Sequence, residues 1–268
     1  AKIQEEEAER ANLEGYSKHT PALPLYTVED AKKAIQLFHA INEEEEIDIE
    51  GAFKARFLYN GHILGSTYIE VKALGRTLVF SGDIGREDDL LLYPPKRPEN
   101  ADLLLIESTY GGRIHPKEQN SLPDLAEIVN KTLSRGGSLF IPSFAVERTQ
   151  LLMLMLWTLL KQNKIPKLPM IMDSPMGADV LDLFKQAHQW HKLTEEECIE
   201  VCSCFRVVQN YKETIEIRTQ TTPQIIIAGS GMMTGGRILS YLEIHGPHEK
   251  DTLLFVGFQA KGTRGWRV

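Results

Sequence analysis

The chain has 268 residues, of which 42% are hydrophobic and 25% charged, and its formal net charge is −7. This balance is typical of a folded globular protein and excludes wholesale disorder. The acidic charge argues against binding nucleic acid through a broadly basic surface. The longest apolar run, residues 151–160, is too short to span a bilayer, so no membrane partner is expected.

Residues 1–111 predict helices followed by strands. Apolar residues recur at helical spacing over 28–41, within a stretch, residues 1–42, that is expected to be helical. The acidic run at 43–46 is interpreted as a solvated turn before a strand. Short β-rich runs bounded by Gly or Pro predict strands at residues 52–59, 66–71, 76–81 and 102–107.

Strands and helices alternate in the second half of the chain. Helices are predicted at residues 121–134, 146–162, 178–189 and 237–244. Strands are predicted at residues 138–141, 168–172, 224–228 and 252–256. This alternation predicts a mostly parallel sheet with helices on its faces.

Three cysteines, Cys198, Cys202 and Cys204, lie close together in this second half. An odd number of cysteines without disulfide spacing is typical of reduced thiols, so a cytoplasmic location is expected. Their spacing differs from that of known structural zinc sites. We therefore interpret them as half-buried thiols near a strand.

Each predicted strand of the second half is followed by a loop of small or polar residues. We call these the strand-end loops; they are residues 142–144 (Pro-Ser-Phe), 173–175 (Asp-Ser-Pro), 229–231 (Gly-Ser-Gly) and 257–259 (Gly-Phe-Gln). In a parallel sheet, ligands bind beyond the carboxyl ends of the strands, and the following helix N-termini offer N–H groups to anions. Ordinary turns favour the same residue types. Four such loops on one edge nevertheless favour an anion or phosphate site.

Two polar residues in the first half are candidate metal ligands. His62 lies in a glycine-flanked loop between two predicted strands, and Asp83 lies in a Ser-Gly-Asp loop at the end of another. Imidazole and carboxylate groups in loops at the ends of strands suit a divalent metal. Taken singly, each is also compatible with an ordinary turn or hydrogen-bonding role.

Seven motifs occur in the order found in β-CASP nucleases of the metallo-β-lactamase superfamily, which this chain resembles over almost its whole length. They begin at residues 61 (Gly-His-Ile-Leu-Gly-Ser), 81 (Ser-Gly-Asp-Ile-Gly-Arg), 107 (Glu-Ser-Thr-Tyr-Gly), 142 (Pro-Ser-Phe-Ala-Val-Glu-Arg), 173 (Asp-Ser-Pro-Met), 230 (Ser-Gly-Met-Met-Thr-Gly-Gly-Arg) and 257 (Gly-Phe-Gln-Ala-Lys-Gly-Thr). The resemblance implies an α/β fold. Residues 1–111 would form a partial metallo-β-lactamase αβ/βα domain, and residues 112–268 an inserted β-CASP domain with a mostly parallel sheet flanked by helices.

The resemblance also implies roles for single residues. His62 would bind one zinc ion and Asp83 would bridge two, and the two ions would activate a water for attack on a phosphodiester. Glu107 would act beside Asp83 as a catalytic residue, by orienting the metal site or moving a proton. Substrate phosphate would be bound by Ser143, Arg148, Ser230 and Arg237.

The chain departs from the family pattern in its zinc ligands. The family's His-x-His-x-Asp-His cluster is missing, because no two of the eight histidines are separated by one residue. The pairs His188/His191 and His245/His248 are interpreted as surface histidines. The late Ser-x-His-like stretch is missing too, and Arg267 stands near a position where RNA-acting members often carry a histidine.

His62 and Asp83 alone cannot fill a tetrahedral site. We therefore expect an incomplete piece of a longer protein. Two zinc ions would bind the complete protein, and zinc would be absent or partial in this chain, which would have little or no nuclease activity by itself.

Three hypotheses for function follow. The leading one is a zinc-dependent phosphodiester hydrolase acting on RNA, in RNA processing or decay, with DNA as another possible substrate. The second is a catalytically inactive relative that binds nucleic acid or phosphate. The third is a small-molecule hydrolase, and it is the least favoured because the α/β half after Gly111 has no obvious use in binding a small substrate. A His-x-His-x-Asp-His run upstream would separate the first two. The choice between exonuclease and endonuclease stays open, as does the oligomeric state, for which a homodimer is one option.

Overall fold

The computed structural model describes residues 1–113 and 121–268, and the chain divides into two compact units, residues 1–45 and 46–268. Within the described residues, no helix combines the length and the apolar character needed to cross a membrane.

The smaller unit consists of helix α1 (Lys2–Glu14) and helix α2 (Val28–Ile35). A capping box at Thr27 begins α2, because the Thr27 side chain accepts the Asp30 N–H while the Asp30 carboxylate accepts the Thr27 N–H. The prediction of a helix extending to residue 41 is wrong. The apolar side chains beyond Ile35, including Phe38 at 77% exposure, are not packed against a core that would extend the helix.

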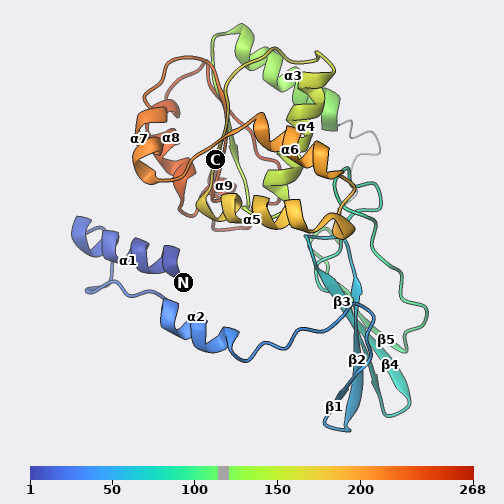
Figure 1. Cartoon of the computed structure of the whole chain (residues 1–268). Helices are drawn as coiled ribbons and strands as arrows, with labels where there is room; N and C mark the ends of the chain where they lie inside the picture. Colours follow the sequence, from blue (N-terminus) through green and yellow to red (C-terminus); the bar gives the residue numbers. More distant parts are fainter. Residues whose placement is uncertain (114–120) are drawn as a thin grey trace. The chain divides into compact units, whose positions relative to one another are not determined.

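The larger unit begins with a five-stranded sheet of order β1-β2-β3-β4-β5 (Figure 1). Its strands are β1 (Ile47–Ile49), β2 (Phe53–Tyr59), β3 (Thr67–Ala73), β4 (Arg76–Phe80) and β5 (Leu103–Leu105). The first four pair antiparallel, and β5 joins β4 in parallel. The four predicted strands are confirmed, whereas the three-residue β1 was not predicted because it is too short to show a period.

The acidic run that precedes β1 is only partly a solvated turn. Glu43 and Glu44 form a turn as predicted. Glu46, however, accepts hydrogen bonds from Lys54 (2.8 Å) and Lys72 (3.0 Å), which lower its pKa to about 2. Its carboxylate therefore links strands β2 and β3.

The rest of the larger unit contains a second five-stranded sheet, of order β10-β6-β9-β7-β8, together with helices. Every pair of neighbouring strands in this sheet is parallel. The strands are β6 (Leu139–Pro142), β7 (Met170–Asp173), β8 (Arg206–Val207), β9 (Ile225–Ala228) and β10 (Thr252–Leu253). The helices are α3 (Ser121–Ser134), α4 (Arg148–Lys161), α5 (Pro175–Gln186), the 3₁₀-helix η1 (His188–Trp190), α6 (Glu195–Ser203), α7 (Tyr211–Ile217), α8 (Arg237–His245) and α9 (Arg264–Arg267). The predicted parallel sheet is confirmed.

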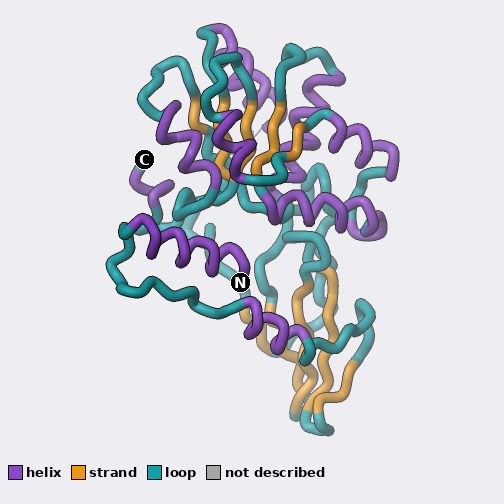
Figure 2. Tube along the Cα trace, turned by 60° about the vertical axis from the view of Figure 1, so that its left-hand side comes forward, coloured by secondary structure: helices purple, strands orange, loops and turns teal. Residues whose placement is uncertain are grey.

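Helices cover both faces of this sheet (Figure 2). Side chains alternate along a strand, so Leu139 and Ile141 of β6 pack into one core with α3 to α6, while Phe140 packs into a second core with α7 and α8. All three are almost fully buried. A sheet buried on both faces explains why these strands read as continuous apolar runs.

The cysteines were placed only partly correctly by the sequence. Cys198 and Cys202 lie on helix α6, and Cys198 is fully buried, so the prediction of half-buried thiols near a strand is wrong for Cys198. It holds for Cys204, which is partly buried two residues before β8. Helices α6 and α7 and strand β8 were not predicted, because no clear apolar pattern marks them in the sequence.

Candidate functional site

Two loops of the first sheet bring His62 and Asp83 together. His62 lies in the loop between β2 and β3, and Asp83 lies three residues after β4. The Nε2 atom of His62 is 3.7 Å from Oδ2 of Asp83, and both side chains are exposed. The predicted proximity of these residues is confirmed. Because both side chains are exposed, their nitrogen and oxygen atoms can coordinate a metal ion that enters from solution.

The buried side chain of Asn60 holds these two loops. Its Nδ2 donates to the backbone carbonyls of Ser81 (3.0 Å) and Asp83 (2.8 Å). Its Oδ1 accepts a 2.6 Å bond from Ser66, whose hydroxyl also accepts the His62 N–H at 3.0 Å. Asn60 was not predicted as a site residue, although it directly precedes the Gly-His motif.

The same loops touch backbone to backbone. A Cβ atom added to Gly85 would lie 2.0 Å from the carbonyl oxygen of Gly61, so no larger residue fits there. Gly61 itself has φ +69°, in the left-handed region that favours glycine. The glycines of both motifs thus allow the His62 and Asp83 loops to approach each other.

We predict that Asn60→Ala lowers the free energy of unfolding by roughly 1–3 kcal/mol, because the buried bond to the Ser81 carbonyl and the partly buried bond to the Asp83 carbonyl are lost. Urea unfolding of the 268-residue chain measures this change. Asn130→Ala is the matched control, because the Asn130 side chain makes one exposed hydrogen bond to the Lys164 carbonyl. An equal loss of unfolding free energy in both variants would show that the Asn60 hydrogen bonds stabilise the chain no more than one exposed hydrogen bond does.

Glu107 lies beside the Asp83 loop. Its Oε1 accepts the backbone N–H of Ile84 at 2.9 Å, and its own N–H donates to the Ser81 hydroxyl at 3.0 Å. The carboxylate therefore helps to fix the residue that follows Asp83. This contact fits an orienting role for Glu107.

A nitrogen and a carboxylate oxygen are ligand types that suit zinc. Two donors nevertheless fill only half of a tetrahedral site. His62 and Asp83 therefore fit as two ligands of a divalent ion and do not form a complete site by themselves.

The strand-end loops converge at one edge of the parallel sheet, because β10, β6, β9 and β7 are consecutive neighbours. The Nε2 of Gln259 donates to the carbonyl of Gly231 at 3.0 Å. A Cβ atom on Gly231 would lie 2.8 Å from the Phe144 ring. Glycine is therefore required where the loop after β9 meets those after β6 and β10.

The predicted phosphate-binding residues differ in their exposure. Ser143 is buried, and its hydroxyl donates to the Phe144 carbonyl (3.2 Å) and accepts from Thr149 (3.1 Å). Ser230 is half-buried and donates to the Gly235 carbonyl at 3.0 Å. Arg148, the first residue of α4, is half-buried, and no described residue forms a hydrogen bond or ion pair with its guanidinium.

Arg237 is engaged within the protein. Its guanidinium lies 3.3 Å from the fully buried carboxylate of Asp173, contacts the Thr214 hydroxyl and stacks on the Tyr211 ring at 5.1 Å. Tyr241 donates to the other oxygen of Asp173 at 2.7 Å. Burial raises the pKa of Asp173, whereas the hydrogen bonds from Tyr241 and Thr214 and the charge of Arg237 oppose that rise. Arg237 thus compensates a buried charge, and its role toward phosphate stays a prediction.

Glu147 precedes Arg148 and is unusual in three respects. Its carboxyl group is buried, neither oxygen has a hydrogen-bond partner in the described residues, and its φ is +68°. Burial, together with the negative charge of Asp89, raises its pKa to about 8, although Arg148 opposes that rise. Glu147 was not singled out from the sequence, where a charged residue at the start of a helix indicates a solvated position.

The prediction that both histidine pairs lie on the surface is wrong for one member of each pair. His191 is 1% exposed and His245 is 7% exposed. His245 is held by Asp251, at 2.8 Å from its Nδ1, and by the Arg218 carbonyl, at 3.0 Å from its Nε2. One-turn spacing in the sequence places two histidines side by side but does not say whether a core covers them.

A hollow of about 580 Å³ combines aromatic and cationic side chains. The rings of Tyr110 and Phe258 meet edge to face with centroids 5.8 Å apart, and Trp266 also lines the hollow. Arg113 and Lys261 supply positive charge. This combination can stack a planar ring and attract an anion.

Comparisons with known proteins find one domain model and several relatives. Residues 149–268 match the model of the Beta-Casp domain. The chain is 34% identical to Ribonuclease TTHA0252 of Thermus thermophilus, over 91% of this chain and 58% of that protein. It is 29% identical to an RNase J-like protein of Methanocaldococcus jannaschii, over 90% and 57%, and 28% identical to Endoribonuclease ysh1 of Schizosaccharomyces pombe, over 91% and 32%. The chain thus spans less than two thirds of the length of each of these relatives.

Proposed function

Because the chain belongs to the β-CASP family of the metallo-β-lactamase superfamily, we propose that the protein containing it is a zinc-dependent hydrolase of RNA phosphodiester bonds. Residues 1–111 would contribute to a metallo-β-lactamase domain and residues 112–268 would form the β-CASP domain. A cytoplasmic location, expected from the three thiols, is part of the same proposal.

The observation that carries this proposal is the approach of His62 and Asp83 on loops fixed by Asn60. In the complete protein, His62 and Asp83 would be ligands of a two-zinc centre, and such a centre supplies an activated water and neutralises phosphate charge. Glu107 would keep Asp83 oriented through the Ile84 amide.

RNA as the substrate is supported by the aromatic and cationic hollow and by the relatives, two of which are named ribonucleases or endoribonucleases. Single-stranded nucleic acid binds to proteins through stacking of bases on aromatic rings and through cations that face the phosphates. Tyr110, Phe258 and Trp266 would stack bases, while Arg113 and Lys261 would attract phosphate. The overall charge of −7 is compatible with such a local site.

Arg148 and Ser230 would bind phosphate at the strand-end loops. Arg148 begins helix α4, where free backbone N–H groups favour an anion, and its guanidinium is not used by other described residues. The Ser230 hydroxyl is only partly covered. Ser143 is buried, so it would act by shaping its loop unless the loop opens.

We predict that, in the complete protein, Arg148→Ala raises KM for a single-stranded RNA by roughly tenfold and changes kcat little, since loss of one phosphate contact costs about 1–2 kcal/mol of binding. Steady-state kinetics on RNA, with a DNA of the same sequence beside it, measure both constants. Arg76→Ala is the control, because Arg76 is exposed at the opposite end of β4 from the Asp83 loop.

Unchanged KM in Arg148→Ala would remove this residue from the substrate site. Equal cleavage of DNA and RNA would remove the preference for RNA. Absence of hydrolysis in the zinc-loaded complete protein would reject the enzyme and leave the binding-only alternative.

A further inference from the structure

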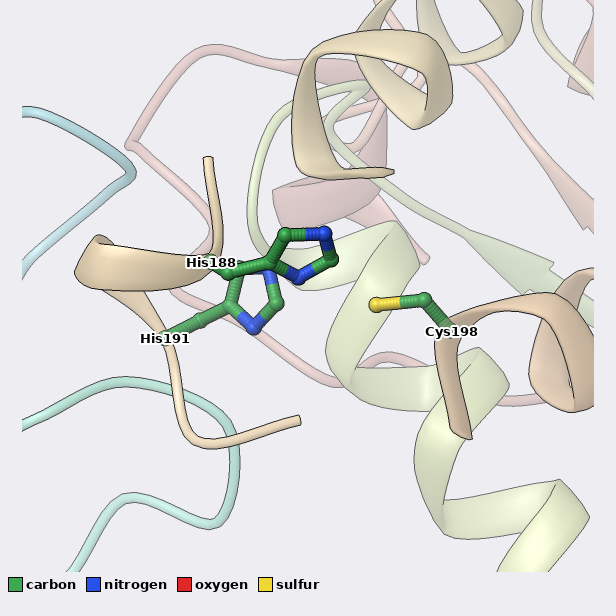
Figure 3. Close-up of side chains that lie close together, drawn as sticks. All are labelled: His188, His191 and Cys198. Atoms are coloured by element: carbon green, nitrogen blue, oxygen red, sulfur yellow. The ribbon is translucent and has the colours of Figure 1, made fainter. Parts of the chain in front are cut away.

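A second group of possible metal ligands lies outside the site described above. His188 and His191, at and just after η1, meet Cys198 on helix α6, and one ligand atom from each residue lies within 4.8 Å of the others. Figure 3 shows the Cys198 sulfur directed at the two imidazole rings. We propose that His188, His191 and Cys198 bind a zinc ion that fastens η1 to α6.

The side chain of His188 carries an unsatisfied polar atom. Its Nδ1 is buried and has no hydrogen-bond partner among the described residues. A buried imidazole nitrogen without a partner is destabilising, because it has lost its hydrogen bond to water. Coordination to a metal ion would satisfy its lone pair.

His191 has the hydrogen bonding expected of a metal ligand. It is buried, and its Nε2 lies 2.9 Å from the Phe184 carbonyl. A carbonyl oxygen only accepts, so Nε2 carries the proton and Nδ1 keeps its lone pair. Donation of one ring N–H to a backbone carbonyl is the usual way in which a ligating histidine is oriented. In the structure, Nδ1 accepts a hydrogen bond from the Leu193 N–H at 3.2 Å. A bound ion would replace this hydrogen bond.

Cys198 supplies a soft ligand. It is 4% exposed, and burial raises the pKa of its thiol to about 11, so a bound ion would have to displace a proton. Two imidazoles and a thiolate favour zinc over magnesium or calcium, which prefer oxygen. The ligand atoms that lie together belong to these three residues, so the fourth position would hold water.

The position of the cluster gives the ion a structural consequence. His191 forms an isolated β-bridge with Leu92, and the N–H of Lys192 donates to the Leu91 carbonyl at 2.9 Å. Leu91 and Leu92, in the loop between β4 and β5, are fully buried. A zinc ion at His191 would therefore stabilise the junction between the loop of the first sheet and the helices of the second.

Titration of the 268-residue chain with Co²⁺ tests the proposal, because a cobalt–thiolate bond gives a charge-transfer band that His62 and Asp83 cannot produce. The expected result is binding of one Co²⁺ per chain with this band, displaced by Zn²⁺. Cys198→Ser should abolish the band, and His188→Asn should weaken Co²⁺ binding at least tenfold. Cys204→Ser, which changes a cysteine outside the cluster, should keep both the band and the affinity.

Absence of the band in the wild-type chain would overturn the proposal, and this measurement needs no variant to fold. Persistence of the band in Cys198→Ser, or its loss in Cys204→Ser, would overturn it as well. Circular dichroism of each variant establishes that the fold is retained. The Asp83→Ala variant should bind cobalt at the thiolate site unchanged, which separates this site from that of the proposed hydrolase.

Discussion

Asp83→Ala in the complete protein is expected to lower kcat for RNA hydrolysis by about a thousandfold, which corresponds to roughly 4 kcal/mol of activation free energy. The reason is geometric. Asp83 offers an exposed carboxylate 3.7 Å from His62, and Asn60 fixes its backbone carbonyl. In the proposed two-zinc centre, Asp83 would be a ligand, and its loss would weaken metal binding and with it the supply of an activated water.

The measurement combines single-turnover kinetics with metal analysis of the purified variant. Asp88→Ala is the matched control, because Asp88 is exposed in the same segment and has no assigned role. Glu107→Gln should lower kcat less, by about 10- to 100-fold, because in the proposed site Glu107 would act through the Ile84 amide and not as a ligand. Near-normal turnover of Asp83→Ala would reject the zinc nuclease proposal.

Four of the five strands of the second sheet could be predicted because strong, local patterns specify them. Strands such as Ile225–Ala228 are short apolar runs followed by small residues, and helix α3 has a clear apolar face. The elements that were missed lack such a pattern. Helix α6 carries three glutamates in its first turn and few apolar residues, and its stability depends on packing of Cys198 and Val201 against other elements.

Only those parts of the site that follow from the order of the motifs could be predicted from the sequence. That order places His62 and Asp83 on neighbouring loops, which the structure bears out. It does not reveal which polar side chains are used internally. The pairing of Arg237 with Asp173 joins residues 64 positions apart, and the buried bonds of Asn60 depend on the packing of two loops. Such partners are set by tertiary structure, which a single sequence does not display.

Glu147→Gln is expected to change how stability depends on pH. The folded-state pKa of Glu147 is about 8, against an ordinary value of 4.5, because burial disfavours the charged form. Between these pH values the folded chain keeps a proton that the unfolded chain releases. The free energy of unfolding therefore falls as pH rises from about 4.5 to about 8, and the stability lost is not regained at higher pH.

Glutamine has nearly the same shape and no charge, so the variant should lose this slope. Near pH 5, where the wild-type carboxyl is protonated in the folded state, the two chains should have similar stability. At pH 9 the variant should be more stable by roughly 2–4 kcal/mol, after allowance for partial hydration of the buried carboxylate. Urea unfolding at a series of pH values measures the difference.

Other groups could mimic this slope, and two variants separate them. Asp89→Asn removes the negative charge that raises the pKa of Glu147, so it should lessen the slope without abolishing it. Glu249→Gln alters an exposed glutamate and should leave the slope as it is in the wild type. Parallel pH profiles for wild type and Glu147→Gln would mean that the buried carboxyl finds a partner or water in solution, and that Glu147 is then ionised beside Arg148 at neutral pH.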